Sequence, residues 1–205
     1  MNESAFDLHF AVLRDRENEE GVADTVLQWW QSIAENEEKG TRKSDKAARA
    51  ELRRVRTPDE ALLTEGFRNL WFALPSGRRD TRDMRAWGCV AAALAEVNSH
   101  DSARSLATAM GSESEAGSGK PRVSELRFQQ LLRSDDLDDF LRRIRRAVRL
   151  LKRDVNVVSL ADDILHWNRE KGGDLAPRPD RRLAVRWAND YFTALATYEK
   201  SRSAS

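Results

Sequence analysis

The sequence predicts an all-α fold organised as two small helical bundles. Apolar residues recur along most of the chain with the period of about 3.6 residues that marks an amphipathic helix. Only 5 of the 205 residues are proline, and alternating strand patterns are sparse. One segment, GSESEAGSGK, is polar and rich in glycine and serine, as flexible linkers are. We therefore expect an N-terminal subdomain over residues 1–110, a flexible linker over 111–121 and a C-terminal subdomain over 122–205.

Five helices are expected before the linker. The first is amphipathic and is followed by a polar break over residues 36–44. The third has a clear start signal, because Thr57 can act as the N-cap, Pro58 suits the first helical position and Glu60 completes a capping box. It ends at the Pro-Ser-Gly sequence of residues 75–77. The five predicted helices cover residues 22–33, 45–56, 57–74, 80–97 and 102–110.

Four further helices are expected after the linker, over residues 124–133, 135–154, 157–170 and 180–199. The helix over 135–154 is the most informative, since a step of about 100° per residue divides it into two faces. One face is apolar and is formed by Leu137, Phe140, Leu141, Ile144, Val148 and Leu151. The other face is cationic and is formed by Arg142, Arg145, Arg146, Arg149, Lys152 and Arg153. The acidic residues over 134–139 suit the helix N-terminus and its dipole.

The charge is unevenly distributed, although the formal net charge is only +1. The first forty residues are rich in acid, whereas basic residues dominate 42–56, 78–85 and 142–153. Runs of arginine on a helix often form a solvated, salt-bridged face. Here the cations share one sector, and arginine suits phosphate better than lysine does. We therefore expect a nucleic-acid surface that follows the phosphate backbone regardless of sequence, because no base-reading motif is present.

The sequence gives no constellation typical of an enzyme. The histidines, His9, His100 and His166, are widely separated and have no partner at a zinc-ligand spacing. Asp162 and Asp163 are adjacent, so their side chains leave a helix about 100° apart, and we interpret them as a solvated face rather than a metal pair. We predict no catalytic residue, no metal ligand and no cofactor.

Other features suggest a protein of the cytoplasm. A single cysteine, Cys89, excludes an intramolecular disulfide, and its apolar neighbours predict that it is buried. The longest apolar run, over residues 88–95, is far shorter than the roughly 20 residues that span a membrane. Most of the six tryptophans are expected in the core. Trp29 and Trp30 are neighbours that cannot both face the same core, so one of them is expected to meet a partner protein.

Three blocks of the sequence resemble a known family. The first is AELRR at residues 50–54, followed by TPDE at 57–60 and Phe67. The second is RSLATAM at 104–110. The third is SELRFQQLLR at 124–133, followed by Leu-Arg-Arg at 141–143. In order and spacing, these blocks resemble the small subunit of the type I-E CRISPR surveillance complex Cascade, the CasB family.

This resemblance implies a non-catalytic protein of two small helical bundles that packs as a homodimer along the guide-RNA complex. Its partners would be the backbone and large subunits of Cascade, the guide RNA and the target DNA, with no membrane involved. It would stabilise guide RNA–target DNA pairing and the displaced strand, the R-loop, in antiviral defence. The alternative is a helical scaffold whose arginine-rich face binds an acidic protein.

The predicted nucleic-acid-binding residues have three origins. The resemblance implies such roles for the arginines of the three blocks, and the helical wheel and a position after Arg78-Arg79 add the others. The full set is Arg53, Arg54, Arg82, Arg104, Arg127, Arg133, Arg142, Arg143, Arg146, Arg149 and Arg153.

Overall fold

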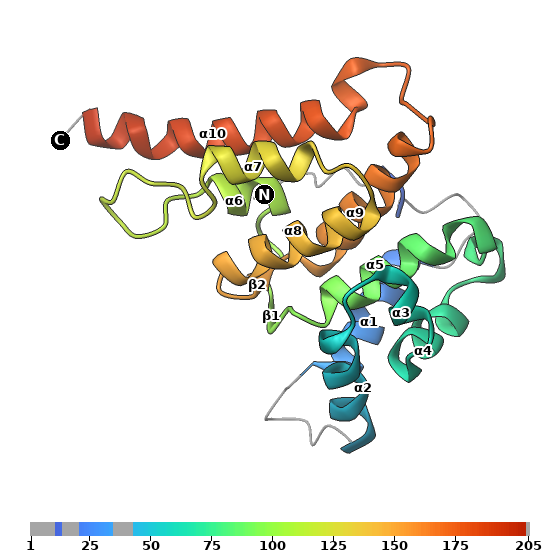
Figure 1. Ribbon diagram of the computed structural model, residues 1–205. Helices are drawn as coiled ribbons and strands as arrows, with labels where there is room; N and C mark the ends of the chain where they lie inside the picture. Colours follow the sequence, from blue (N-terminus) through green and yellow to red (C-terminus); the bar gives the residue numbers. More distant parts are fainter. Residues whose placement is uncertain (1–10, 14–20, 35–42, 204–205) are drawn as a thin grey trace, which may run out of the picture.

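The computed structural model describes residues 11–13, 21–34 and 43–203, and its helical content confirms the all-α prediction (Figure 1). The helices are α1 (Val22–Ile33), α2 (Lys43–Arg54), α3 (Pro58–Leu62), α4 (Glu65–Ala73), α5 (Met84–Leu94), α6 (Leu106–Gly111), α7 (Glu125–Leu132), α8 (Leu137–Leu150), α9 (Val157–Lys171) and α10 (Leu183–Ser203). Two-residue strands, β1 (Ser99–His100) and β2 (Asp154–Val155), pair in parallel. The polar break predicted over residues 36–44 lies mostly outside the described residues.

Side-chain caps set several helix boundaries. The predicted start at Thr57 is confirmed, because its hydroxyl accepts a hydrogen bond from the Glu60 amide at 3.2 Å. The single helix expected after it is wrong, since Thr64 divides it into α3 and α4. The Thr64 hydroxyl donates to the Ala61 carbonyl at 2.7 Å and accepts from the Phe67 amide at 3.2 Å. A residue that caps the next helix cannot continue the previous one.

Helix α5 lies at the centre of the N-terminal half and packs against α2, α3, α4, α8 and α9. Its residues are buried on every side from Ala86 to Leu94, and Cys89 is buried as predicted. The prediction that Trp29 or Trp30 meets a partner is wrong, since both are buried. Their indole N–H groups donate to the Gly66 and Val97 carbonyls at 3.0 and 3.4 Å. Helix α1 packs against both α4 and α9, so it has two buried sides.

Aromatic side chains join the helices of the C-terminal half. Phe140 stacks on Trp167 with ring centroids 4.3 Å apart, and Phe128 stacks on Tyr191 at 4.2 Å. The Tyr191 hydroxyl donates to the Val123 carbonyl at 2.7 Å. The first stacked pair joins α8 to α9, and the second joins α7 to α10. Helix α10 also lies along α6 (Figure 1).

The segment over residues 111–121 is a loop with its own hydrogen bonds. Glu113 and Pro121 form an antiparallel bridge, and the Ser114 amide donates to the Lys120 carbonyl at 2.8 Å. Gly111, at its start, lies so close to α10 that an added Cβ would meet the Tyr191 carbonyl oxygen at 2.3 Å. Helix α6, before the loop, therefore packs directly on α10, after it, and one hydrophobic cluster contains residues of both halves. The division into two subdomains stays a prediction.

The solvated face predicted for Asp162 and Asp163 is wrong, because both side chains are buried. Helix α9 is covered by α1, α5 and α10, so it has no exposed side here. Asp162 accepts hydrogen bonds from the amides of residues 11, 12 and 13 at 2.9, 2.7 and 2.8 Å. Arg78 donates to the Val12 carbonyl at 2.9 Å from the other side. These contacts fix residues 11–13 against α9.

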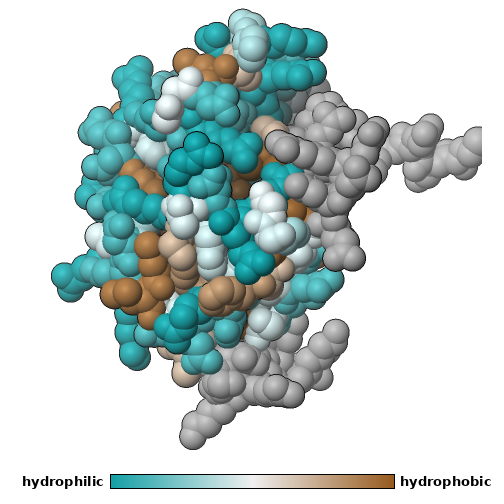
Figure 2. All heavy atoms as spheres, turned by 90° about the vertical axis from the view of Figure 1, so that its right-hand side faces the viewer, coloured by the Kyte–Doolittle hydropathy of each residue, from teal (hydrophilic) through white to brown (hydrophobic). Residues whose placement is uncertain are grey.

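Large apolar side chains remain exposed on several helices. Figure 2 shows apolar patches within a mostly hydrophilic face of the molecule. The most exposed are Leu63 at 79% and Phe72 at 68%, next to and within α4. Within the part of the chain that the structure describes, no helix is long and apolar enough to cross a membrane. The same residues include no group of three or more His, Cys, Asp or Glu side chains that could hold a metal ion.

Candidate nucleic-acid interface

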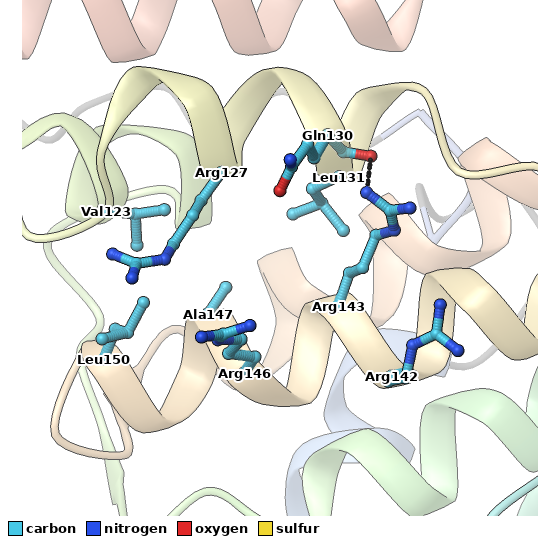
Figure 3. A pocket seen from close by; sticks show the side chains of 9 residues that line it. All are labelled: Val123, Arg127, Gln130, Leu131, Arg142, Arg143, Arg146, Ala147 and Leu150. Carbon is cyan, nitrogen blue, oxygen red and sulfur yellow. Dashed lines mark hydrogen bonds between the residues drawn. The ribbon is translucent and has the colours of Figure 1, made fainter.

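A groove of about 250 Å³ lies between α7 and α8 and is lined by four arginines. Figure 3 shows Arg127 pointing from α7 toward α8 and Arg143 pointing from α8 toward α7. Arg142 and Arg146 complete the cationic lining. The remaining lining residues are neutral and are Val123, Gln130, Leu131, Ala147 and Leu150. The groove thus brings together four of the arginines that the sequence predicts to bind nucleic acid.

Helix α8 positions two of these arginines through its own acid, Asp139. The N-cap residue Asp136 accepts from the Asp139 amide at 2.8 Å, which fixes the first turn. Arg142 hydrogen-bonds to the Asp139 carboxylate, and the Arg143 Nε atom lies 2.7 Å from it. The Arg143 guanidinium holds the pKa of Asp139 below its usual value by stabilising the charged form. Arg143 also donates to the Gln130 carbonyl at 2.9 Å, which connects α8 to α7.

Arg127 and Arg146 are the more available cations of the groove. Both side chains are exposed, and neither forms an ion pair with a carboxylate in the part of the chain that the structure describes. A phosphate could approach them without displacing a protein partner. Their guanidinium groups offer several N–H donors each, in a planar arrangement that suits phosphate oxygens.

A second group of arginines surrounds the carboxylate of Glu96, which follows α5 and is only 1% exposed. We name Glu96 and these arginines the Glu96 cluster. Its members and their distances to the carboxylate oxygens are Arg149 at 2.6 Å, Arg153 at 3.4 Å, and Arg53 and Arg145 at 3.9 Å. Glu96 raises the pKa of the Arg149 guanidinium above its usual value through their hydrogen bond. Arg149 nevertheless keeps 54% of its side chain exposed.

Arg145 departs from the cationic face on which the helical wheel placed it. Its side chain is buried, and it donates to the Leu52 and Val55 carbonyls at 2.6 Å each and to the Ala92 carbonyl at 3.0 Å. Burial lowers the pKa of its guanidinium. Leu52 of α2, Val55 just after α2 and Ala92 of α5 present carbonyl groups that need donors on this side of α8. Arg145 therefore has a structural role.

The other predicted site residues lie outside the groove and the Glu96 cluster. Arg82 pairs with Asp80 at 2.6 Å, and Arg104 pairs with Asp101 at 2.6 Å. Arg54 and Arg133 are exposed at the ends of α2 and α7. A binding role for these four arginines stays a prediction.

Two residues that organise the site were missed by sequence reasoning. Glu96 carried no local signal, because its arginine partners lie about fifty positions away in the chain. Arg49 was also missed. It is buried, and it donates to the Ala95 carbonyl at 3.0 Å and the Val97 carbonyl at 2.5 Å.

We name the arginines of the groove together with the three partly exposed arginines of the Glu96 cluster the arginine band, which has members on α2, α7, α8 and the turn after α8. It contains seven exposed or half-buried arginines, and within the described ranges two carboxylates, Glu96 and Asp139, pair with them. The seven are Arg53, Arg127, Arg142, Arg143, Arg146, Arg149 and Arg153. Such an excess of fixed positive charge suits a polyanion.

Comparison with known proteins identifies relatives of this chain. A sequence model described as CRISPR-associated protein Cse2 matches residues 48–192, a range that contains the whole arginine band. A protein named CRISPR-associated protein Cse2, from Thermus thermophilus, is 33% identical over 103 residues. That alignment covers 50% of this chain and 53% of the relative, so the chain spans about half the length of the curated relative it matches. No solved structure matches the chain significantly.

Proposed function

The chain belongs to the Cse2 (CasB) family of CRISPR-associated proteins, and from this premise we propose that it is a non-catalytic subunit of the type I-E Cascade complex. In this proposal it binds nucleic-acid backbones without sequence preference. It stabilises the pairing of guide RNA with target DNA and the displaced strand of the R-loop, as part of antiviral defence in the cytoplasm. Its partners are the backbone and large subunits, the guide RNA, the target DNA and a second copy of the chain.

The observation that carries this proposal is the arginine band. Its groove side has Arg127 and Arg146 without a described carboxylate partner, and its other side keeps Arg149 half exposed despite the ion pair with Glu96. Cations that neutralise phosphates release counterions from the nucleic acid, which gives affinity without reading bases. The planar guanidinium groups of the band suit phosphate oxygens, and contacts to phosphates position a protein on nucleic acid without reading its sequence.

A modest number of phosphate contacts is sufficient for such a role. The exchange of a DNA duplex for a guide–target heteroduplex is nearly balanced in free energy. Protein contacts to the nucleic-acid backbone can therefore shift it. A subunit that contributes a few such contacts stabilises the opened target while base pairing supplies the sequence specificity.

Charge reversal in the groove tests this function. We expect the triple variant R127E/R142E/R146E, assembled into the guide-RNA complex, to bind target DNA more weakly than wild type. A plot of log K against log[salt] has a negative slope, and each lost phosphate contact reduces the magnitude of that slope by about one. Binding titrations over a salt series measure both quantities. Arg149 is left unchanged because a second carboxylate there would lie against the buried Glu96.

The matched control is R181E, which reverses an exposed arginine between α9 and α10, outside the band. It should leave the affinity and the slope close to those of wild type. Equal losses for R181E and for a single reversal in the groove would contradict a localised site, since a general charge effect would then be sufficient.

The alternative function is a helical scaffold whose arginines bind an acidic protein. The acid-rich first forty residues of the chain favour this alternative, because another copy could present them to the band. It predicts negligible affinity for nucleic acid at moderate salt together with strong self-association. Analytical ultracentrifugation and DNA titration under the same conditions distinguish the two functions.

A further inference from the structure

Glu96 is a buried acid that several arginines share. It lies just after α5, and its side chain is 2% exposed. One carboxylate oxygen is 2.6 Å from Arg149 Nη2, and the other is 3.4 Å from Arg153 Nη1 and 3.9 Å from Arg53 Nε. A carboxylate this deeply buried requires cationic partners, so it fixes the guanidinium groups around it.

The three outer arginines of the Glu96 cluster turn part of their side chains toward solvent. Arg149 is 54% exposed, Arg53 is 32% exposed and Arg153 is 27% exposed. Since a guanidinium has five N–H donors and a carboxylate uses only some of them, donors remain for a second anion. Long arginine side chains lose conformational freedom on binding. A shared acid that holds them in place reduces that loss when a phosphate arrives.

The backbone around the cluster supports the same arrangement. Lys152 and Arg153 have left-handed backbone conformations, with φ of 57° and 62°, which non-glycine residues adopt at a cost. This turn brings the Arg153 carbonyl to the amides of Asn98 and Ser99, at 2.8 and 3.2 Å. The turn that carries Arg153 is thereby attached to the segment that follows Glu96.

We propose that Glu96 is a positioning residue of the arginine band, which holds Arg53, Arg149 and Arg153 in the arrangement that receives nucleic-acid phosphates. This inference rests on the proposed function. It makes a prediction opposite to that of simple charge counting. Removing an acid makes the band more positive, so charge alone predicts tighter binding, whereas loss of positioning predicts weaker binding.

The test uses Glu96→Gln and Glu96→Asp in the assembled guide-RNA complex. Glutamine keeps the shape without the charge, and aspartate keeps the charge but is one methylene too short to reach all its partners. We expect each variant to bind target DNA roughly threefold to tenfold more weakly, which corresponds to the loss of one or two contacts. We also expect the magnitude of the negative slope of log K against log[salt] to fall by about one.

Two controls separate positioning from charge and from stability. Glu125→Gln removes an exposed acid of α7 that hydrogen-bonds only to Gln129 among the described residues, and it should bind as tightly as wild type or more tightly. Val26→Ala removes buried volume from α1 and should lower the thermal unfolding midpoint without changing the salt slope. A merely structural Glu96 would behave as Val26→Ala does.

The possible outcomes are distinct. If a Glu96 variant enters the complex and binds as tightly as wild type, or more tightly, with an unchanged or steeper slope, the positioning role is wrong. If omission of the wild-type chain changes neither affinity nor slope, the proposed function itself fails. If omission of the wild-type chain weakens binding, and both Glu96 variants reduce the magnitude of the slope while the control variants do not, the positioning role is supported.

Discussion

Asp162 and Asp163 are neighbours in sequence, and their carboxyl groups have different surroundings. Asp162 accepts three backbone hydrogen bonds from residues 11–13. Asp163 accepts a long hydrogen bond from the Ser159 hydroxyl, at 3.5 Å. Burial, together with the adjacent Asp162, raises the pKa of Asp163 from 3.8 to about 8. Asp163 therefore keeps its proton over a pH range in which an exposed aspartic acid has lost it.

This difference predicts a pH dependence of stability. Between pH 4 and 8 the unfolded chain has released this proton while the folded chain retains it, so the free energy of unfolding falls as pH rises. Asp163→Asn is neutral at every pH and should remove this component. We expect its stability relative to wild type to rise with pH by at most about 1.4 kcal/mol per unit. Urea denaturation at a series of pH values measures the effect. The exposed control Asp174→Asn should keep the wild-type pH dependence, and equal slopes for wild type and Asp163→Asn would contradict the assignment.

Sequence spacing predicts the direction in which a side chain leaves its helix but not what covers that direction. The spacing argument correctly placed Arg146 and Arg149 on the exposed part of α8. It placed Arg145 there as well, although that side chain is buried and donates to carbonyl groups of Leu52 in α2 and Ala92 in α5. It also treated Asp162 and Asp163 as solvated, because a single helix gives no sign of the three helices that enclose α9.

At the scale of the element, α8 connects the core to the arginine band. Its apolar face was predicted in full, and all six apolar positions are buried. The acidic residues over 134–139 were expected at its N-terminus, but the helix begins at Leu137 with Asp136 as its N-cap, two residues later than predicted. The splitting of α3 from α4 and the pairing of β1 with β2 were not predicted. The strands are two residues long and lie more than fifty residues apart, so no local pattern marks them.

Substitution of two consecutive arginines of α8 should affect different properties, the stability of the fold for Arg145 and DNA binding for Arg146. Arg145→Met leaves three buried carbonyl groups without their donor and should lower the free energy of unfolding by about 2–4 kcal/mol. Arg146→Met removes an exposed side chain and should change it by less than about 0.5 kcal/mol. Chemical denaturation of the two variants measures this difference. In the assembled complex, Arg146→Met should weaken DNA binding instead. Comparable stability losses for both would show that the two sides of α8 are misassigned.

At the scale of the whole molecule, contacts between distant segments assemble the candidate site. The groove needs α7 and α8, and the Glu96 cluster needs α2, the end of α5, α8 and the turn before β2. The sequence indicated the arginines through their pattern and through the family resemblance. It did not indicate Glu96, because the ion pairs of Glu96 join residues far apart in the chain and depend on the complete fold. Asp139 pairs with arginines three and four residues later, and it was expected only as an acid suited to the helix N-terminus. The family match over residues 48–192 includes every arginine of the band.

In the proposed function, this chain strengthens the binding of the guide-RNA complex to its target through phosphate contacts. The most direct measurement is target-DNA binding by the reconstituted complex, with and without the chain, over a salt series. We expect omission of the chain to weaken binding and to reduce the magnitude of the negative slope of log K against log[salt], because the counterion release caused by the arginine band is lost. Unchanged affinity together with an unchanged slope would rule out this role of the arginines and favour the protein scaffold.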